Sequence, residues 1–273
     1  MNRQWLFVRL PNPMRSRPEE HTARVLSTMT ADLVAHLRAE DPDALWRFGR
    51  PGPVTGPDLG LWFHSTEPVL KELERRLRAQ TSEHNWPMIT GAHLPETAKY
   101  RTPRTLRLAD RLATVSSTFA LELLRGNRLD EERRQWLAAA HLWRLSALTG
   151  EKERAAFLFH FWQFGTDVLA PADRVELAAQ ADAWALAPVC GRLPGGEGLW
   201  DAYVTEVRDL IAAGREDGVP VNFLLYDHVL LTHDRLGVAA RTGARAARAV
   251  RTALAAGTPV PVTLAGATAL QSA

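Results

Sequence analysis

The chain has 273 residues, of which 46% are hydrophobic, so it is long enough to bury the core of one large domain or two small ones. Its single cysteine, Cys190, excludes a disulfide within the chain and a cage of cysteine thiolates around a metal ion. The formal net charge of +2 does not indicate nucleic-acid binding without a concentrated basic patch. Because the first residues do not form a signal peptide and no window approaches a membrane span, we expect a cytoplasmic protein that does not enter a membrane.

The N-terminal part predicts a small unit of strands and helices. Residues 5–10 are bulky and are followed by proline, which indicates a strand, and residues 59–64 indicate a second strand. Apolar residues recur every four positions through residues 19–40, which predicts an amphipathic helix. Glycine and proline are so frequent in residues 48–57 that we expect a loop there, and Pro68 is expected to open a short helix.

The rest of the chain has an almost entirely helical pattern. The expected fold class is α+β and mostly helical, with a small N-terminal sheet-containing unit packed on a larger helical region. We expect residues 1–273 to form one domain with an α+β subregion (1–95), a helical subregion (96–257) and a tail (258–273). The glycine-rich residues 191–198 are the one connection that looks flexible. The predicted helices span residues 104–125, 130–149, 151–169, 171–187, 198–213, 219–236 and 241–256.

The most unusual segment is residues 224–237, which places several reactive polar side chains in an otherwise apolar helix. A helix with only a structural role would carry Ala, Leu, Glu or Lys at most of these positions. A face that is half apolar and half polar suits the wall of a substrate cavity. A buried helix whose polar groups pair with other helices is an equally good alternative. The candidate site residues in this segment are Tyr226, Asp227, His228, His233 and Arg235.

A second candidate stretch, residues 93–100, precedes the predicted helix that carries Ser116 and Ser117. It contains Glu96 and Tyr100 at a loop and helix entry, where functional polar groups often gather. The alternative is that Glu96 caps a helix and Tyr100 is a half-buried packing residue.

Four arginines, Arg101, Arg104, Arg107 and Arg111, recur at about helical spacing. Such a row is able to hold an acidic peptide or a phosphate. The alternative is a solvated helix face.

The familiar catalytic motifs are absent from the sequence. It contains no phosphate-binding loop, dinucleotide fingerprint, nucleophile elbow or zinc-protease helix. His228 and His233 lie five positions apart, which does not put two metal ligands on one helical face. We therefore predict that the protein uses neither a metal ion nor an organic cofactor.

The order of several short motifs resembles that of a known family. After a tryptophan-containing first strand and a Gly/Pro loop come Gly-Leu-Trp-Phe-His (60–64), Pro-Glu-Thr-Ala-Lys-Tyr (95–100), Ser-Ser-Thr-Phe-Ala-Leu-Glu-Leu-Leu (116–124) and Thr-His-Asp-Arg-Leu-Gly (232–237). This order, which covers most of residues 1–255, is similar to the thiopeptide-type bacteriocin biosynthesis family. That family is related to the C-terminal elimination domain of lantibiotic dehydratases.

Two branches of the family carry out different reactions. The branch that eliminates glutamate from glutamylated Ser or Thr typically has His-Leu-Arg in the second strand and His-Met-His-x-Asn-Arg near the end. Here Gly60 stands in the place of that arginine, and Leu230 stands in the place of the catalytic histidine. An eliminase without this imidazole and this guanidinium would be badly impaired. The departures therefore favour the second branch, the pyridine synthases of thiopeptide biosynthesis.

The resemblance implies a cofactor-independent cyclase that acts on a precursor peptide with a leader, dehydroalanines and azoles. One dehydroalanine, as its imidic-acid tautomer, would supply a 2-azadiene and another would supply the alkene for a formal [4+2] aza-cycloaddition. Loss of water and of the leader would give a pyridine-centred macrocycle. The candidate catalytic residues are Tyr226, Asp227, His228, Glu96, Ser116 and Ser117; the candidate substrate- or leader-binding residues are Tyr100, Arg101, Arg104, Arg107, Arg111, His233 and Arg235.

Two other functions stay open. One is a glutamate-eliminating domain with a rearranged site, and the other is a non-catalytic peptide-binding partner in a biosynthetic complex. The family also suggests a homodimer.

Overall fold

The computed structural model describes residues 2–12, 18–49, 58–93, 95–125, 129–185 and 194–257. Cys190, the tail from residue 258, residues 50–57 of the predicted loop and residues 191–193 of the connection 191–198 lie outside the described residues. The strands are β1 (Arg3–Leu10), β2 (Leu45–Gly49), β3 (Leu59–Thr66) and β4 (Ile89–Gly91). The helices are α1 (Pro18–Val25), η1 (Leu26–Thr30), α2 (Ala31–Glu40), α3 (Glu67–Glu83), α4 (Thr97–Tyr100), α5 (Pro103–Leu124), α6 (Glu131–Ser146), α7 (Glu151–Phe164), α8 (Pro171–Ala185), α9 (Gly196–Glu216), α10 (Val221–Arg235) and α11 (Ala240–Ala255).

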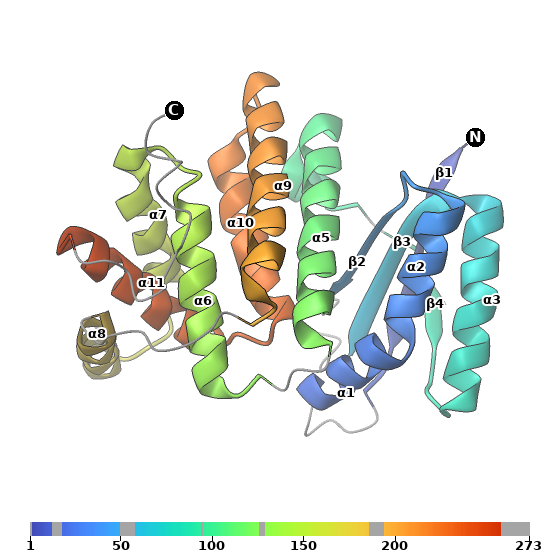
Figure 1. Ribbon diagram of the computed structural model, residues 1–273, viewed down its shortest axis with the longest axis horizontal. Coiled ribbons are helices and arrows are strands. Elements are labelled where there is room, and N and C mark those ends of the chain that lie inside the picture. The colour runs from blue at the N-terminus through green and yellow to red at the C-terminus, as the bar shows by residue number, and fades with distance from the viewer. Residues whose placement is uncertain are drawn as a thin grey trace. The chain divides into compact units, whose positions relative to one another are not determined.

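The four strands form one antiparallel sheet in the order β2-β3-β1-β4. Side chains alternate between its two faces. One face carries fully buried residues such as Val8, Leu61 and Phe63, and α1, α2 and α3 cover it (Figure 1). The other face carries half-buried aromatic and basic side chains of β1, β2 and β3. The expected fold class, α+β and mostly helical with a small N-terminal sheet, is confirmed.

The chain divides into two compact units. The first comprises residues 1–128 and 198–237, and the second comprises residues 129–197 and 238–273. In the first unit, α5 packs against both β2 and α10, and α10 also contacts β2. All the candidate site residues belong to this first unit.

In the second unit, α11 packs against α6, α7 and α8. The residues Trp162, Leu177 and Ala244 form a buried cluster between these helices. The turn after α7 needs a glycine at position 165, because a Cβ there would collide with the Ala240 carbonyl oxygen and lie 2.8 Å from the Ala244 side chain.

The helix boundaries follow local chemistry. Thr102 accepts the backbone N–H of Thr105 and Pro103 follows it, so α5 begins with a side-chain cap and a proline in its first turn. Asp130 caps α6 in the same way, by accepting from the backbone N–H of Arg133. The predicted helix 19–40 is continuous but contains the π-helical turn η1. Strands β2 and β4 were not predicted, because five and three residues are too few to show a periodicity.

Candidate functional site

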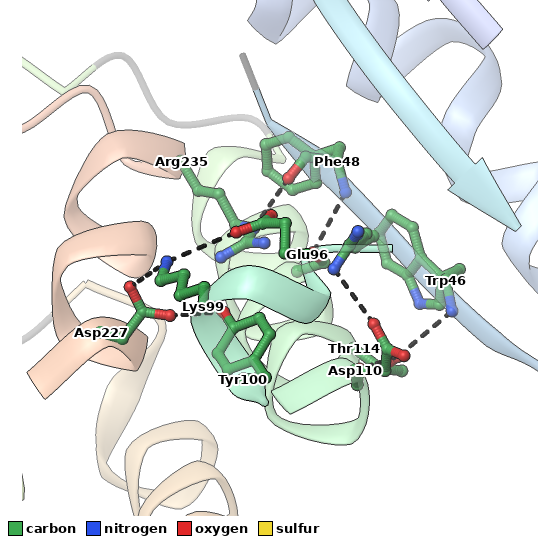
Figure 2. Close-up of polar contacts among 11 residues, drawn as sticks. Trp46, Phe48, Glu96, Lys99, Tyr100, Asp110, Thr114, Asp227 and Arg235 are labelled. Carbon is green, nitrogen blue, oxygen red and sulfur yellow. Dashed lines mark hydrogen bonds and ion pairs between the residues drawn. The ribbon is translucent and has the colours of Figure 1, made fainter. Parts of the chain in front are cut away.

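Side chains from α5 and α10 form hydrogen bonds with the backbone of the edge strand β2. Trp46 donates its backbone N–H to Oγ1 of Thr114, and Phe48 donates its own to Oγ of Ser117, both at 3.2 Å. Nε of Arg235 donates to the Phe48 carbonyl oxygen at 2.8 Å, as Figure 2 shows. An edge strand usually presents unpaired backbone groups, so these three side chains hold β2 in place beside the helices.

The two candidate serines take part in this arrangement. Both are fully buried. Oγ of Ser116 lies 2.7 Å from Oγ1 of Thr232 and accepts from Nη1 of Arg235 at 3.1 Å. Burial lowers the pKa of Arg235 to about 10, so its guanidinium remains charged at neutral pH. Because these hydroxyls bond to protein atoms away from solvent, the geometry gives Ser116 and Ser117 a structural role.

A polar cluster joins α4 to α10 (Figure 2). The Tyr100 hydroxyl donates to Oδ2 of Asp227 at 2.6 Å, and Nζ of Lys99 lies 2.6 Å from Oδ1 of the same carboxylate. Lys99 is also 3.6 Å from the carboxylate of Glu96. Burial and the charge of Asp227 raise the pKa of Tyr100, so its phenol stays protonated and keeps donating. The half-exposed Glu96 forms the open side of the cluster.

A further ion pair, between Arg47 on β2 and Asp110 on α5, lies next to this cluster. Nη1 of Arg47 is 3.1 Å from Oδ1 of Asp110, and their side chains are only 12% and 10% exposed. The guanidinium also lies over the rings of Trp5 and Trp62, at 5.4 and 5.3 Å from their centroids. Burial raises the pKa of Asp110 to about 6, against the opposing effect of Arg47 and with a further contribution from Glu96. A carboxyl group with this pKa exchanges a proton near neutral pH, as a general acid or base must.

Aromatic and imidazole rings line the half-buried face of the sheet around Arg47. Trp5 lies between His64 and His93, with ring centroids 4.9 Å apart on each side. Phe7 and Trp62 are stacked at 4.8 Å. Burial, followed by the charge of the Arg47 guanidinium, lowers the pKa of His93 to about 4, so its imidazole is neutral at physiological pH. This face is therefore a ring-lined surface whose imidazoles carry no charge at neutral pH.

The two histidines predicted on α10 are buried in the interior of the first unit. Nε2 of His228 is 2.7 Å from the Tyr203 hydroxyl on α9. Burial lowers the pKa of both His228 and His233 to about 3, so both are neutral. The structure therefore separates His228 from its neighbour in sequence, Asp227, which faces the α4 cluster.

Tyr226 is half-buried, and burial raises the pKa of its phenol. It is therefore a neutral hydrogen-bond donor at working pH. It directly precedes Asp227 on α10.

The four arginines of the predicted row do not lie on a single helix. Arg101 is exposed and ends α4 with a φ of 54°, whereas Arg104, Arg107 and Arg111 line a cavity beside α5. That cavity is separate from the polar cluster.

Sequence reasoning missed three residues of the site: Arg47, Lys99 and Asp110. A signal for Asp110 was present, because it lies three and seven positions before Ala113 and Ser117 on the buried face of α5. A carboxylate among buried positions indicates that another side chain of the protein pairs with it. The alternation of β2 was too short to show which face Arg47 occupies.

Within the part of the chain that the structure describes, no group of three or more His, Cys, Asp or Glu side chains is arranged to hold a metal ion. No helix of the described residues is long and apolar enough to cross a membrane.

Comparisons with known proteins agree with this architecture. A family model for the C-terminal region of lantibiotic biosynthesis dehydratases matches residues 5–254. The crystal structure of the tRNA-dependent lantibiotic dehydratase MibB from Microbispora sp. 107891 is similar, with a TM-score of 0.63 and 18% identity over 90% of this chain and 28% of MibB. The crystal structure of TsrL is similar over 93% of this chain and 95% of its own, with a TM-score of 0.67 and 16% identity. At these identities the likeness establishes the fold alone, and the chain spans 28% of the length of MibB. No curated protein sequence matches the chain.

Proposed function

Because this chain belongs to the family of lantibiotic biosynthesis dehydratase C-terminal domains, we propose that it is a thiopeptide pyridine synthase. The family gives it a role in the biosynthesis of ribosomally made and modified peptides. The finer proposal is that it joins two dehydroalanines of a precursor peptide that carries azoles and a leader, and then releases the leader.

The observation that carries this proposal is the packing around Gly60. The elimination branch has an arginine in this place. Here a Cβ on Gly60 would collide with the ring of Trp62, at 2.6 Å from Cζ3, and would lie 3.2 Å from Cε2 of Phe7. The stacked rings of Phe7 and Trp62 occupy the space that an arginine side chain would need. Together with Leu230 in the place of the catalytic histidine, this packing argues against glutamate elimination and favours the cyclase branch.

The reaction requires groups that move protons without a strong nucleophile. Two carbon–carbon bonds form between the 2-azadiene and the alkene and close the ring. The hydroxyl of the former imidic carbon then leaves as water with a ring proton. Finally the carbon–nitrogen bond to the leader breaks, and the leader departs as a carboxamide with a second proton. Holding the two dehydroalanines in contact is the largest contribution that the protein can make, worth up to about 7–11 kcal/mol.

The described residues supply suitable proton donors and acceptors. The carboxyl group of Asp110, with a pKa of about 6, is able to protonate the departing hydroxyl and take a proton back. The neutral phenol of Tyr226 is able to stabilise the imidic-acid tautomer by donating a hydrogen bond. Glu96 and Lys99 at the open side of the cluster would position the peptide backbone. No step of this mechanism uses a metal ion or an organic cofactor.

The experiment is to incubate the protein with a leader-bearing peptide that contains two dehydroalanines and azoles, and to follow the products by mass spectrometry. We expect an intact leader ending in a carboxamide and a macrocycle lighter than the substrate by the leader plus water. The rate should not change when a chelator is added. A product that retains its leader, or a rate that collapses with the chelator, would contradict the proposal.

The same assay tests the two alternatives. An eliminating domain would convert a glutamylated peptide into a linear peptide with dehydroalanine. A binding partner without catalytic activity would leave both substrates unchanged while retaining affinity for the leader.

A further inference from the structure

A cavity of about 350 Å³ lies between α5 and the C-terminal end of α9, away from the polar cluster. One wall is the face of α5 that carries three arginines at spacings of three and four residues. The other wall is the end of α9 and the turn after it. The lining residues are Arg104, Arg107, Leu108, Arg111, Ala213, Gly214, Asp217 and Val219.

The floor of the cavity is apolar and closely packed. Leu108, Gly214 and Val219 are buried. A Cβ on Gly214 would collide with Cδ2 of Leu108 and lie 3.2 Å from the side chain of Val221. Only glycine therefore lets α9 approach α5 this closely, and the approach shapes a floor of leucine and valine side chains.

The rim of the cavity carries uncompensated positive charge. Arg104 is paired with Asp217 at 3.6 Å, and both side chains are about half exposed. Arg107 and Arg111 are exposed and form no ion pair or hydrogen bond with any described residue. Two guanidiniums one helical turn apart beside an apolar floor suit a ligand that combines carboxylates with one apolar side chain.

We propose that this cavity binds an acidic peptide segment, with one apolar side chain of the peptide on the floor of Leu108 and Val219. Carboxylates on either side of that side chain pair with Arg107 and Arg111. The identification of this segment as part of the leader of the substrate rests on the proposed function. The binding of an acidic peptide itself does not.

The first test is the affinity of the full chain for a labelled synthetic peptide that has glutamates on both sides of one leucine, measured by fluorescence polarisation. The variant R107E/R111E should weaken binding by about tenfold or more at low salt and by less at high salt, because exposed charges are screened. The matched control is R76E/R78E on α3, which changes the net charge equally at exposed positions that do not line the cavity. If both double variants bind the peptide equally well, the proposal is wrong.

The second test addresses the apolar floor without changing the charge. Ala213 lines the cavity and is exposed, so A213F should fill the cavity while leaving the fold intact. In the wild type, replacing the leucine of the peptide by alanine should weaken binding severalfold. In A213F both peptides should bind with the same reduced affinity. A leucine preference that survives in A213F would place the apolar side chain elsewhere and overturn the proposal.

The two proposals fail separately. If the wild type binds the acidic peptide through Arg107 and Arg111 but does not cyclise a dehydroalanine substrate, the cavity assignment stands and the cyclase proposal falls. Suppose instead that the wild type cyclises the substrate, and that R107E/R111E and R76E/R78E have the same KM and the same affinity for the acidic peptide. The cyclase proposal then stands and the cavity assignment falls.

Discussion

The Tyr100 hydroxyl donates a hydrogen bond of 2.6 Å to the carboxylate of Asp227, across 127 positions of sequence. This contact ties the four-residue helix α4 to α10, and the ion pair of Lys99 with the same carboxylate strengthens it. A helix of one turn has little stability of its own. The position of Glu96 and Lys99 at the site therefore depends on Asp227.

We predict that Tyr100 and Asp227 are energetically coupled. The single variants Tyr100→Phe and Asp227→Ala should each lower the free energy of unfolding by about 1–3 kcal/mol, because each leaves a buried polar group without its partner. In the double variant the losses should be less than additive by about 0.5 kcal/mol or more. Urea unfolding of the wild type, the two single variants and the double variant measures this coupling. Strictly additive losses would mean that the contact does not hold α4.

A methyl group at position 60 should displace Trp62. Gly60→Ala is expected to lower the free energy of unfolding by about 1–3 kcal/mol, because the Trp62 ring must leave its stack with Phe7. Its cross-strand partner Gly49 is the matched control, since a Cβ there meets nothing within 4 Å. Gly49→Ala should be neutral or stabilising. Equal effects of the two substitutions in urea unfolding would show that the ring stack leaves room at position 60.

The stability of the protein should depend on the proton of Asp110. Folding raises the pKa of this carboxyl from 3.8 to about 6, so the folded state binds the proton more tightly than the unfolded chain. The resulting stabilisation is fully present below about pH 4 and is lost as the pH rises through about 6, and its size is about 3 kcal/mol at most. Asp110→Asn should remove this part of the pH dependence. Urea midpoints of both proteins at about pH 4 and about pH 7 provide the measurement, and parallel pH profiles would contradict the assignment.

Tyr226→Phe should reduce turnover by roughly 10²-fold or more while leaving the melting temperature almost unchanged. This substitution keeps the ring and removes only the donor. The control is Tyr203→Phe, which breaks the buried contact with His228 and should cost about 1–3 kcal/mol of stability but little turnover. A stable Tyr226→Phe variant with wild-type turnover would move the search for the donor to Tyr100 and Asp110.

Ser117→Ala tests the structural assignment of the buried serines. The substitution leaves the buried N–H of Phe48 without its acceptor, so we expect a loss of about 1–3 kcal/mol in the free energy of unfolding. Turnover per folded molecule should stay near that of the wild type. A large loss of turnover with unchanged stability would instead restore Ser117 as a reacting group.

The sequence by itself determined the fold class and most of the helices, because an amphipathic helix repeats its apolar positions within one segment. All seven predicted helices from residue 104 onward begin within two residues of α5, α6, α7, α8, α9, α10 and α11. The sequence also indicated Glu96, Tyr100 and Asp227 as polar residues in unusual places, and the structure brings these three together.

Only the tertiary structure decided which polar residues meet and which are used for packing. Periodicity assigns a residue to a face but does not name the element that covers that face. Asp110 meets Arg47 across 63 positions, and Arg235 bonds to Phe48 across 187, because α5 and α10 pack against each other and both contact the edge strand β2. The same packing takes His228 and Ser117 out of reach of solvent. Burial, which depends on the whole chain, then raises the pKa of Asp110 and lowers that of His228, and so decides which of these groups exchanges a proton near neutral pH.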